Sequence, residues 1–596
     1  MPPRTRAAYL GDLNPFRNSA DGSVNVTNAP YNADPTGAVD ATAAFRAAAA
    51  SGASRIVVPA GNYLVSSVAS GTPLLNFVNR DGVTIDAGEA TITNPTSYTL
   101  DTITPMFLFD NCRNVRVTLG AYVGYTLPTP ETHHGYRGGT LVRLINGCDT
   151  VKVEAKITNA RYGIQAGEYA DQTKGYNRNI DVKLRCFFVG YPVALYLADN
   201  VRYDVDADSV HRAVYLAGCQ DVRGVARWKD QYIADIATLI TDAKTGTGTS
   251  RGCSNLDVTS IDKGSTVTTA STTCSGIALS RVDPGIVYEN IKIKVHAKST
   301  DAVSPRTGGF TMVSGAKALT TPVADYNWEP SITIRNVSVS GVLDHSEQTT
   351  EGNTAGDVFV RAYDTLVAHS ATIENLSFED LIIRQSSGNT RALWLEAPGI
   401  VNSGVQFRNV QAPNAKLVLL TNATVPTTFE GCKLKELNVV GVTAGSRVVL
   451  LRSSIDALTG TTGDNMNTDT VGSSIGGAGA FIRQKQITLD LVGASTTWSA
   501  AIPTGALVLG VQGIVKEAVT GASGYQVGPS AELTRYVNTN TVTLNSTFGP
   551  TNQSATETPR YYLATTDLVV TAKTAPFTDG QLRLIVTYLV FPAPTS

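Results

Sequence analysis

One short phrase recurs through the middle of the chain and constrains the fold more than any other feature. Most copies begin with an Asn followed by alternating apolar and polar residues, as in Asn179-Ile-Asp-Val-Lys-Leu and Asn290-Ile-Lys-Ile-Lys-Val, while Thr150 and Asp221 begin two others. The first apolar residues of the copies are at positions 115, 151, 180, 201, 222, 256, 291, 337, 376 and 410. The shortest spacing, from 180 to 201 and from 201 to 222, is 21 residues, and loops lengthen the others. A repeated unit with insertions of variable length indicates a solenoid.

Each copy has the pattern of a β-strand with one buried face, because apolar and polar residues alternate. An Asn before the strand is apt, since Asn tolerates the left-handed backbone region and bonds its own backbone at turns. Asn side chains stacked in successive repeats also form amide ladders. A second strand follows in each repeat, for example Leu141-Val-Arg-Leu and Val214-Tyr-Leu. Short strands at this spacing predict a parallel β-helix.

Insertions separate some of the strands. We expect loops at residues 120–139, 166–178, 262–275, 297–308 and 343–356. Residues 228–244 differ, because apolar residues recur there at helical spacing. The spacing favours an inserted helix in this segment, and a strand around Thr238-Leu-Ile is the alternative.

The composition excludes several classes of protein. Apolar residues are 42% of the chain and charged residues are 16%, which is unlike a disordered protein. A formal net charge of −2 argues against a nucleic-acid partner. The chain also lacks a run of 18 apolar residues, which argues against membrane insertion.

Seven Cys residues are present without a CxxC pair, so neither a complete disulfide framework nor a zinc ribbon is expected. Four of them lie three residues before the first apolar residue of a copy: Cys112, Cys148, Cys219 and Cys253. These four share one place in the repeat, and we therefore expect buried thiols that contribute to packing.

The segment before the repeats combines a helix with short motifs. It contains Asn32-Ala-Asp-Pro-Thr-Gly, Asp40-Ala-Thr-Ala-Ala-Phe and Val58-Pro-Ala-Gly-Asn-Tyr. Asp40 suits the cap of a helix over residues 41–50, and Gly52 suits its end. This segment resembles the opening of the pectate-lyase superfamily and, more narrowly, of bacteriophage tailspike proteins. The resemblance implies right-handed β-helices that bind or cut polysaccharides and, for tailspikes, parallel homotrimers.

The expected fold class is all-β: a right-handed parallel β-helix with a short N-terminal capping helix and a C-terminal β-sandwich. We expect residues 1–30 to face the virion and residues 31–456 to form the β-helix. Residues 457–480 are rich in Gly, Thr and Ser and are expected to be a linker. Residues 481–596 contain strand-like runs between turn-rich segments, which predicts a β-sandwich for trimerisation or glycan binding.

The outward residues of the second strand form one column along the repeats. In the superfamily that the chain resembles, the equivalent strand lines the substrate groove. The column contains Arg143, Gln165, Ala194, Tyr215, Ala278, Thr311, Phe359 and Trp394. Aromatic faces suit the C–H surfaces of sugars, while Arg and Gln suit hydroxyl or carboxylate groups. We predict substrate binding by Arg143, Gln165, Tyr215, Phe359 and Trp394, and ordinary stacking along a strand is the alternative.

The candidate catalytic residues lie beside this column: Asp206, Asp208, His211 and Arg212. Glycoside hydrolysis needs two carboxylates, and two steps along a strand separate two residues by roughly 6.6 Å. Lyase chemistry instead needs a base and a cation that stabilises an enolate, which His211 and Arg212 can supply. The further candidates are Asp357 and Glu396, the loop of residues 131–137, and a groove between subunits.

The 21-residue register gives a second interpretation of these carboxylates. It places Arg185, Asp206 and Arg227 in one outward column, beside a column of Glu154, Lys183 and Asp204. Columns of this kind form charge ladders. The series Asp204, Asp206, Asp208 also resembles the start of a calcium loop, but its sixth position is Ser209 and its twelfth is Tyr215. No metal and no cofactor is therefore expected.

These observations predict a phage tailspike that binds and hydrolyses a polysaccharide of the host cell surface. A polysaccharide lyase and a non-enzymatic receptor-binding spike are the alternatives. The expected partners are two further copies of the chain, the polysaccharide, and phage tail or baseplate proteins at the N-terminus. The start of the chain lacks the apolar stretch of a signal peptide, so we expect synthesis in the host cytoplasm and a place in the virion.

Overall fold

The computed structural model describes residues 22–590, which fall into two compact units. The first unit contains the chain up to residue 427 and the second contains residues 467–596, while residues 428–466 are divided between them. Inside the described span, the residues left out are 99–102, 126–138, 169–173, 232–235, 245–249, 264–273, 281–285, 299–306, 315–331, 346–357, 363–370, 386–390, 397–399, 403–404, 421–426, 441–445, 461–465, 472–473, 476–480 and 550–558.

A sheet of 31 strands winds through the first unit and into the divided segment, and successive coils pair in parallel. Its first strands are β1 (Ser23–Asn25), β2 (Arg55–Val57), β3 (Gly61–Leu64), β4 (Leu75–Val78), β5 (Thr84–Thr93), β6 (Pro105–Asp110), β7 (Arg113–Val123), β8 (Thr140–Ile145), β9 (Asp149–Ala166), β10 (Arg178–Tyr196), β11 (Asp199–Val210), β12 (Val214–Ala217), β13 (Gln220–Gln231) and β14 (Ile236–Thr241).

The sheet continues with β17 (Ser254–Asp262), β18 (Cys274–Ser280), β19 (Ile286–Lys298), β20 (Thr307–Ser314), β21 (Ile332–His345), β22 (Val358–Ala362), β23 (Ala371–Gln385), β24 (Arg391–Glu396), β25 (Ile400–Asn402), β26 (Val405–Arg408), β27 (Gln411–Leu420), β28 (Thr427–Glu430), β29 (Lys433–Val440), β30 (Ser446–Leu451), β31 (Ser454–Gly460), β32 (Met466–Val471) and β33 (Ser474–Ile475). β15 (Ala243–Lys244) and β16 (Ser250–Arg251) form a small antiparallel pair beside it.

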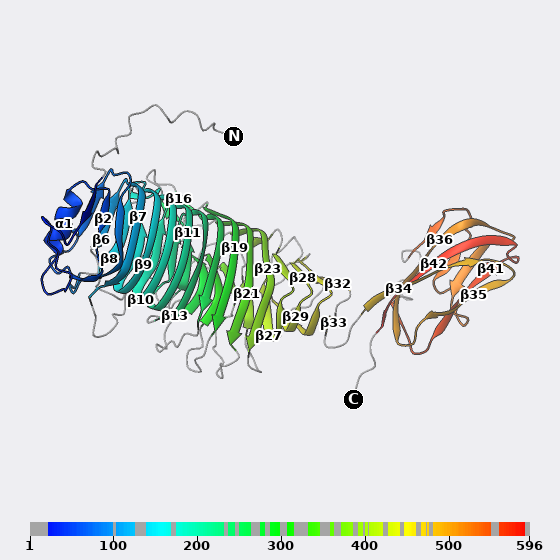
Figure 1. The fold of residues 1–596 in the computed structure, drawn as a ribbon. Coiled ribbons are helices and arrows are strands. Elements are labelled where there is room, and N and C mark those ends of the chain that lie inside the picture. Colours follow the sequence, from blue (N-terminus) through cyan, green and yellow to red (C-terminus); the bar gives the residue numbers. More distant parts are fainter. Residues whose placement is uncertain are drawn as a thin grey trace, which may run out of the picture. The chain divides into compact units, whose positions relative to one another are not determined.

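Each repeat identified in the sequence corresponds to one coil of the structure. Val151, Ile180, Val201 and Val222 occupy one register position on β9, β10, β11 and β13. The Asn residues that begin the copies have left-handed backbones, with φ between 50° and 63°. The prediction of a parallel β-helix is confirmed, and Figure 1 shows its strands stacking one after another along the first unit.

The interior of the coils is a continuous apolar core. Val, Ile and Leu residues from successive coils are buried there, as the alternating pattern predicts. Aromatic rings also stack from coil to coil, with 5.2 Å between the ring centres of Phe77 and Phe109 and 5.0 Å between those of Phe378 and Phe407. These stacks hold the coils in one register, because a slip by one residue would turn every interior side chain outward.

The single helix of the described residues, α1 (Thr42–Ala50), lies at the first end of the stack (Figure 1). Phe45 on α1 is fully buried, and its ring meets the edge of Tyr63 with 5.6 Å between ring centres. Asp40 Oδ1 accepts hydrogen bonds from the Thr42 backbone N–H at 2.9 Å and from its hydroxyl at 2.5 Å. The predicted capping helix is therefore present, but Asp40 is not its N-cap: the N-cap residue is Ala41, one position later, and it makes no side-chain cap hydrogen bond. No helix among the described residues is long and apolar enough to cross a membrane.

The helix expected within residues 228–244 is not formed, and this prediction was wrong. Trp228 continues strand β13, while Ile236–Thr241 form strand β14. β14 pairs with β12 on one side and with β18 on the other, which is the place of a second strand in a coil. Parallel pairing to both neighbouring coils outweighs the helical spacing of the apolar residues, and the alternative of a strand around Thr238 is confirmed.

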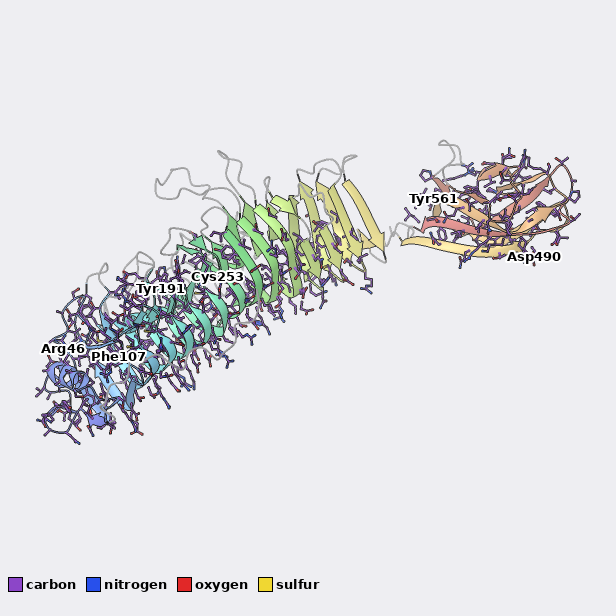
Figure 2. The ribbon with its side chains drawn as sticks, turned by 90° about the horizontal axis from the view of Figure 1, so that it is seen from above. Arg46, Phe107, Tyr191, Cys253, Asp490 and Tyr561 are labelled. Carbon is purple, nitrogen blue, oxygen red and sulfur yellow. The ribbon has the colours of Figure 1, made fainter. Side chains whose placement is uncertain are left out.

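The described part of the second unit contains a sandwich of two antiparallel sheets. One sheet has β34 (Phe481–Asp490), β36 (Ala506–Thr520), β39 (Thr547–Phe548), β40 (Arg560–Tyr562) and β42 (Asp579–Val590). The other has β35 (Ser495–Ile502), β37 (Gly524–Gly528), β38 (Val537–Thr539) and β41 (Thr566–Lys573). Figure 2 labels Asp490 and Tyr561, which both lie in this sandwich. The end of β31, together with β32 and β33, lies within residues 457–480, and β33 pairs in parallel with β31.

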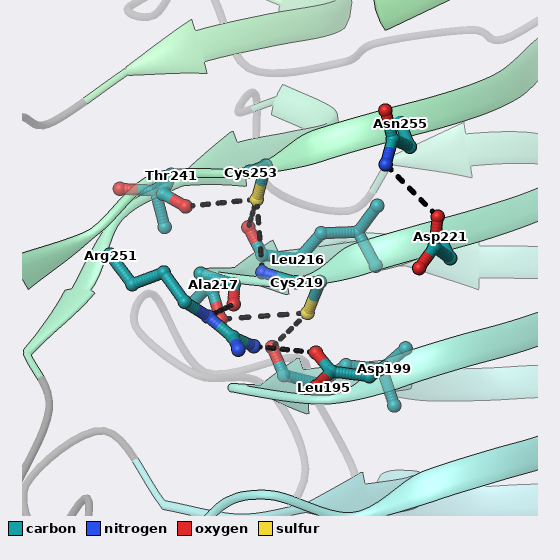
Figure 3. Close-up of polar contacts among 11 residues, drawn as sticks. Leu195, Asp199, Leu216, Ala217, Cys219, Asp221, Thr241, Arg251, Cys253 and Asn255 are labelled. Carbon is teal, nitrogen blue, oxygen red and sulfur yellow. Dashed lines mark hydrogen bonds and ion pairs between the residues drawn. The ribbon is translucent and has the colours of Figure 1, made fainter. Parts of the chain in front are cut away.

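The Cys residues of the repeat share an additional role beyond packing. The Cys253 thiol accepts a hydrogen bond from the backbone N–H of Cys219 in the preceding coil at 3.3 Å, as Figure 3 shows. Cys148 accepts from the N–H of Cys112 in the same way at 3.4 Å. In other coils an amide or a hydroxyl takes this position, because Asn177 accepts from Cys148 at 2.9 Å and Ser453 accepts from Cys432 at 3.0 Å.

Candidate functional site

The structure aligns the second-strand column as the recurring second-strand motif predicts, although only Ala194 and Tyr215 are 21 residues apart. Arg143 lies opposite Gln165, Gln165 opposite Ala194, and Ala194 opposite Tyr215. Leu239 from β14 then enters the column between Tyr215 and Ala278. Thr311, Phe359 and Trp394 continue it, and for these three only the backbone register is described.

Four tyrosines surround the first part of this column. We call them the tyrosine face: Tyr162, Tyr191, Tyr196 and Tyr215, which belong to one cluster of buried residues. The rings of Tyr162 and Tyr191 stack from coil to coil with 5.0 Å between centres and an angle of 22°. The rings of Tyr196 and Tyr215 lie 5.3 Å apart at 43°. Tyr191 is labelled in Figure 2 and marks the place of this face on the stack.

Cationic side chains flank the tyrosine face. The Arg212 guanidinium lies 5.7 Å from the centre of the Tyr215 ring, and that of Arg161 lies 5.3 Å from the centre of Tyr162. The His211 ring meets Tyr191 edge-on at 5.1 Å. The backbone N–H groups of His211 and Arg212 both donate to the Gly190 carbonyl, at 3.1 and 2.9 Å, which fixes the corner between β11 and β12.

A polar cluster lies at the other side of this face. Arg143 Nη2 donates to Glu168 Oε2 at 2.6 Å, and Lys174 Nζ donates to the same oxygen at 2.9 Å. Gln165, opposite Arg143, is 2% exposed, and its Oε1 has no hydrogen-bond partner among the described residues. A buried acceptor without a donor costs about 1–3 kcal/mol, and this oxygen is also screened from solvent by the residues around it.

The exposure of the rings differs from the sequence-based expectation. Tyr215 is 6% exposed and the other three tyrosines are between 6% and 8% exposed, so a ligand reaches only a small part of each ring. The physical reason is the stacking of one tyrosine on the next and of guanidinium groups on the outer rings. Burial, followed by the neighbouring Tyr162 and Tyr215, raises the pKa of Tyr196 well above its usual value.

The four candidate catalytic residues divide between two faces of the coil. His211 and Arg212 join the tyrosine face, whereas Asp206 and Asp208 project from β11 on the neighbouring face. There Asp206 lies between Arg185 and Arg227 in register and forms an ion pair with Lys263. In the neighbouring column Lys183 Nζ lies 3.2 Å from Glu154, and Arg227 of the first column crosses over to Asp204, with 2.6 Å between Nη1 and the carboxylate.

Sequence reasoning missed several residues of this site. Glu168 follows β9 by two residues and was assigned to a loop, although an acidic residue directly after a groove strand is a usable signal. Tyr162 and Tyr191 lie three residues before the column residues of their strands, and Tyr196 lies two residues after Ala194. The recurrence of tyrosine close to the second strand could have indicated this aromatic cluster. The loop of residues 131–137 and Asp357 lie outside the described residues, and of Glu396 only the strand position is described.

The described residues contain no group of three or more His, Cys, Asp or Glu side chains that could hold a metal ion. The tyrosine face itself carries aromatic surfaces, guanidinium and ammonium groups, one carboxylate and one amide. That set can bind hydroxyl-rich molecules through ring contacts and directed hydrogen bonds.

No protein-family model matches the chain, and no curated protein matches it. Among solved structures, the chain is similar to the tailspike protein of E. coli bacteriophage HK620 in complex with pentasaccharide. The identity is 12% and the TM-score 0.39, over 95% of this chain and 93% of that chain. A mutant of the same tailspike, also in complex with pentasaccharide, matches at 11% identity and a TM-score of 0.37 over the same shares. The parallel β-helix described above rests on the strand pairing of this chain itself.

Proposed function

We propose that this protein is a phage tailspike that binds a bacterial surface polysaccharide through the tyrosine face. The observation that carries the proposal is the combination, beside the second strands, of four stacked and largely buried tyrosine rings with the polar groups of Arg143, Gln165 and Glu168. Sugars present C–H surfaces to aromatic rings and hydroxyl groups to polar side chains, so a glycan site needs this mixture. The opening motif in residues 32–63 supports the same class of protein.

The polar groups have different roles in this site. Glu168 holds the Arg143 guanidinium in place, so the remaining N–H groups of Arg143 are oriented toward a ligand. Gln165 Oε1 lacks a partner among the described residues, and a sugar hydroxyl that reached it after the covering side chains moved would supply one. The tyrosine rings contribute contact area that needs little ordering on binding, because the stack already fixes them.

Retention of purified polysaccharides on immobilised full-length protein tests this proposal. Arg143→Gln and Gln165→Met remove polar contacts with little loss of volume, and we expect each to weaken retention roughly tenfold. Lys292→Gln is the control, because Lys292 is exposed on β19 away from this column. Unchanged retention in both site variants, or no retention of any capsular polysaccharide or lipopolysaccharide, would contradict the proposal.

Hydrolysis of the bound polysaccharide is the second candidate function. It is favoured by Asp206 and Asp208, which project from one face of β11 and are separated by roughly 6.6 Å along the backbone. That spacing is of the order that two hydrolytic carboxylates require. His211 and Arg212 follow at the corner that leads to the tyrosine face. New reducing ends would indicate hydrolysis, unsaturated uronates would indicate a lyase, and retention without cleavage would indicate a receptor-binding spike.

We also propose that the tailspike is a homotrimer in the virion. Residues 1–30 would face tail or baseplate proteins, and the sandwich beginning near residue 481 would serve trimerisation or glycan contact. The long side surface of the coil stack and the resemblance of the opening motif support this assembly. Light scattering of the full chain should give three times the monomer mass of 62.9 kDa, and the monomer mass would contradict the proposal.

A further inference from the structure

A cavity of about 210 Å³ opens on the face of the stack that carries the Asn-headed strands. Its lining includes Gly88 of β5, Thr118 and Gly120 of β7, and charged residues of the next two coils. The volume is many times the ~10–15 Å³ that one water molecule requires. The cavity therefore has room for a small organic ligand.

Two successive irregularities of the sheet create this cavity. Between β5 and β7 the register shifts after Ala87 and Leu119, and between β7 and β9 it shifts after Leu119 and Ala155. Lys156 consequently has no opposite residue on β7, where Gly120 and Ala121 bulge out of the ladder. Bulges of this kind often lie next to functional sites, because they redirect side chains and interrupt pairing.

Two unpaired cations line the cavity next to each other. Lys156 lies opposite Arg185 in the next coil, and neither side chain forms an ion pair with a described residue. Like charges placed directly opposite each other in a sheet are destabilising. The neighbouring pair differs, because Lys183 and Glu154 neutralise each other at 3.2 Å. Asp206 lies opposite Arg185 on the next coil but is ion-paired with Lys263, so the sheet keeps a local positive charge at the cavity while the whole chain has a formal net charge of −2.

The remaining lining residues can also bind the hydroxyl groups of a larger ligand, in addition to an anionic group. Thr118 supplies a hydroxyl and Glu154 a carboxylate, both of which accept hydrogen bonds from hydroxyl groups. Cations at one side and acceptors at the other match a molecule that has an anionic group and several hydroxyls. An acidic sugar has this combination.

We propose that this cavity is an anion-selective subsite that binds the carboxylate of an acidic sugar, separate from the tyrosine face. Lys156 and Arg185 pair with the carboxylate, while Thr118 and Glu154 contact the hydroxyl groups. The sugar part of this inference rests on the proposed binding of polysaccharide, but the anion selectivity does not. It assigns an acidic unit to the polysaccharide, which the tyrosine face alone does not require.

Lysine acetylation of the full-length protein, followed by mass spectrometry, tests the inference in solution. The probes are sodium glucuronate, sodium phosphate and glucose, each at the same ionic strength. At a glucuronate concentration ten times its dissociation constant, acetylation of Lys156 should slow about tenfold, as mass action requires. Glucose should give no protection, and phosphate should protect Lys156 less than glucuronate does.

Lys152 is the matched internal control, because it is exposed on the same strand β9 and lies opposite Arg116, another cation, without lining the cavity. Its acetylation should not respond to glucuronate. Arg185→Gln should remove the protection of Lys156, whereas Arg116→Gln should leave it unchanged. All four residues are exposed, and equal melting temperatures of the variants will show that the fold is retained.

Three outcomes would overturn the inference: no protection of Lys156, equal protection of Lys152 and Lys156, or phosphate protecting as strongly as glucuronate. No protection would show that glucuronate does not bind at Lys156. Equal protection of Lys152 would show a general effect of the anion on surface lysines, and equal protection by phosphate would show that the sugar is not recognised. The retention experiment with Arg143→Gln gives a separate answer. If polysaccharide is retained but glucuronate does not protect Lys156, the proposed function stands and this subsite is contradicted. If glucuronate protects Lys156 but no polysaccharide is retained, the anion subsite stands and the proposed function is contradicted.

Discussion

Asn200 Nδ2 donates a hydrogen bond of 2.6 Å to Asn179 Oδ1 in the preceding coil. Asn179 in turn donates to Asp149 Oδ1 at 2.6 Å. Both Asn backbones are left-handed, with φ of 52° for Asn200 and 56° for Asn179. The same arrangement recurs further along the stack, where Asn375, Asn336, Asn290 and Asn255 donate in series and the last donates to Asp221. One residue type thus forms the turn and links neighbouring coils.

Asn200→Ala should therefore destabilise the stack in two ways. It removes a hydrogen bond, worth about 0.5–1.5 kcal/mol, and places a β-carbon in a left-handed backbone at roughly 1–2 kcal/mol. Asn200→Gly loses the bond but tolerates the backbone, so its loss should be smaller. Urea unfolding of the three proteins at one pH measures both differences. An Ala variant as stable as the Gly variant would contradict the backbone part of this explanation.

The ladder and the column were predictable because both follow from the repeat alone. The recurring motif of each second strand places Gln165 opposite Arg143 without any knowledge of the loops. The strand at Ile236–Thr241 was only the alternative to a helix in the prediction. Its pairing partners are distant in sequence, and the spacing of its apolar residues also suits a helix.

The burial of Tyr215 was not predictable for a related reason. Alternation tells which face of a strand is outward, but not what lies against that face. Neighbouring tyrosines and Arg212 come from positions that the period does not mark, and they cover the ring. The contact between Glu168 and Arg143 was missed because the carboxylate follows the strand rather than belonging to it.

Cys253→Ser should be tolerated better than Cys253→Val. The thiol accepts from the Cys219 N–H at 3.3 Å and donates to the Thr241 carbonyl at 3.2 Å (Figure 3). A serine hydroxyl can make both contacts, as Ser453 accepts from Cys432 in a later coil. Valine leaves the buried Cys219 N–H without an acceptor, at a cost of about 1–3 kcal/mol. Thermal unfolding compares the two variants, and equal losses would argue that the position matters only for volume.

Asp40 should stabilise the N-terminal cap at neutral pH and lose this effect in acid. Burial raises its pKa, but hydrogen bonds from Ser67, Thr42 and Ser66 outweigh burial and lower the pKa to about 2. An unfolded Asp has a pKa of about 3.9, so the folded carboxylate is stabilising above pH ~4 and this contribution disappears as the pH falls toward 2.

Thermal unfolding of the wild type and Asp40→Ala across this range tests the sign of the effect. The two melting temperatures should differ most at neutral pH and converge in acid. Glu89→Gln, which changes an exposed carboxyl on β5, should show no such convergence. A difference between wild type and Asp40→Ala that is constant from pH 7 to pH 2 would show that the charge of Asp40 does not contribute.

Substitution of Asp206 and Asp208 tests the proposed hydrolysis most directly. Both residues project from β11 toward solvent, so Asp206→Asn and Asp208→Asn keep the shape of the strand and remove carboxylate chemistry. If the pair supplies the acid and the second carboxylate, each variant should cleave polysaccharide roughly 10²-fold more slowly or worse. Asp204→Asn is the control, because Asp204 lies on the same face of β11 and is paired with Arg227 at 2.6 Å. Reducing-end assays measure cleavage, and melting temperatures show that the fold is retained.

Full cleavage by both Asp206→Asn and Asp208→Asn would contradict this assignment and place the chemistry on another carboxylate. Glu168 at the tyrosine face is the first to test, because Arg143 and Lys174 already orient it.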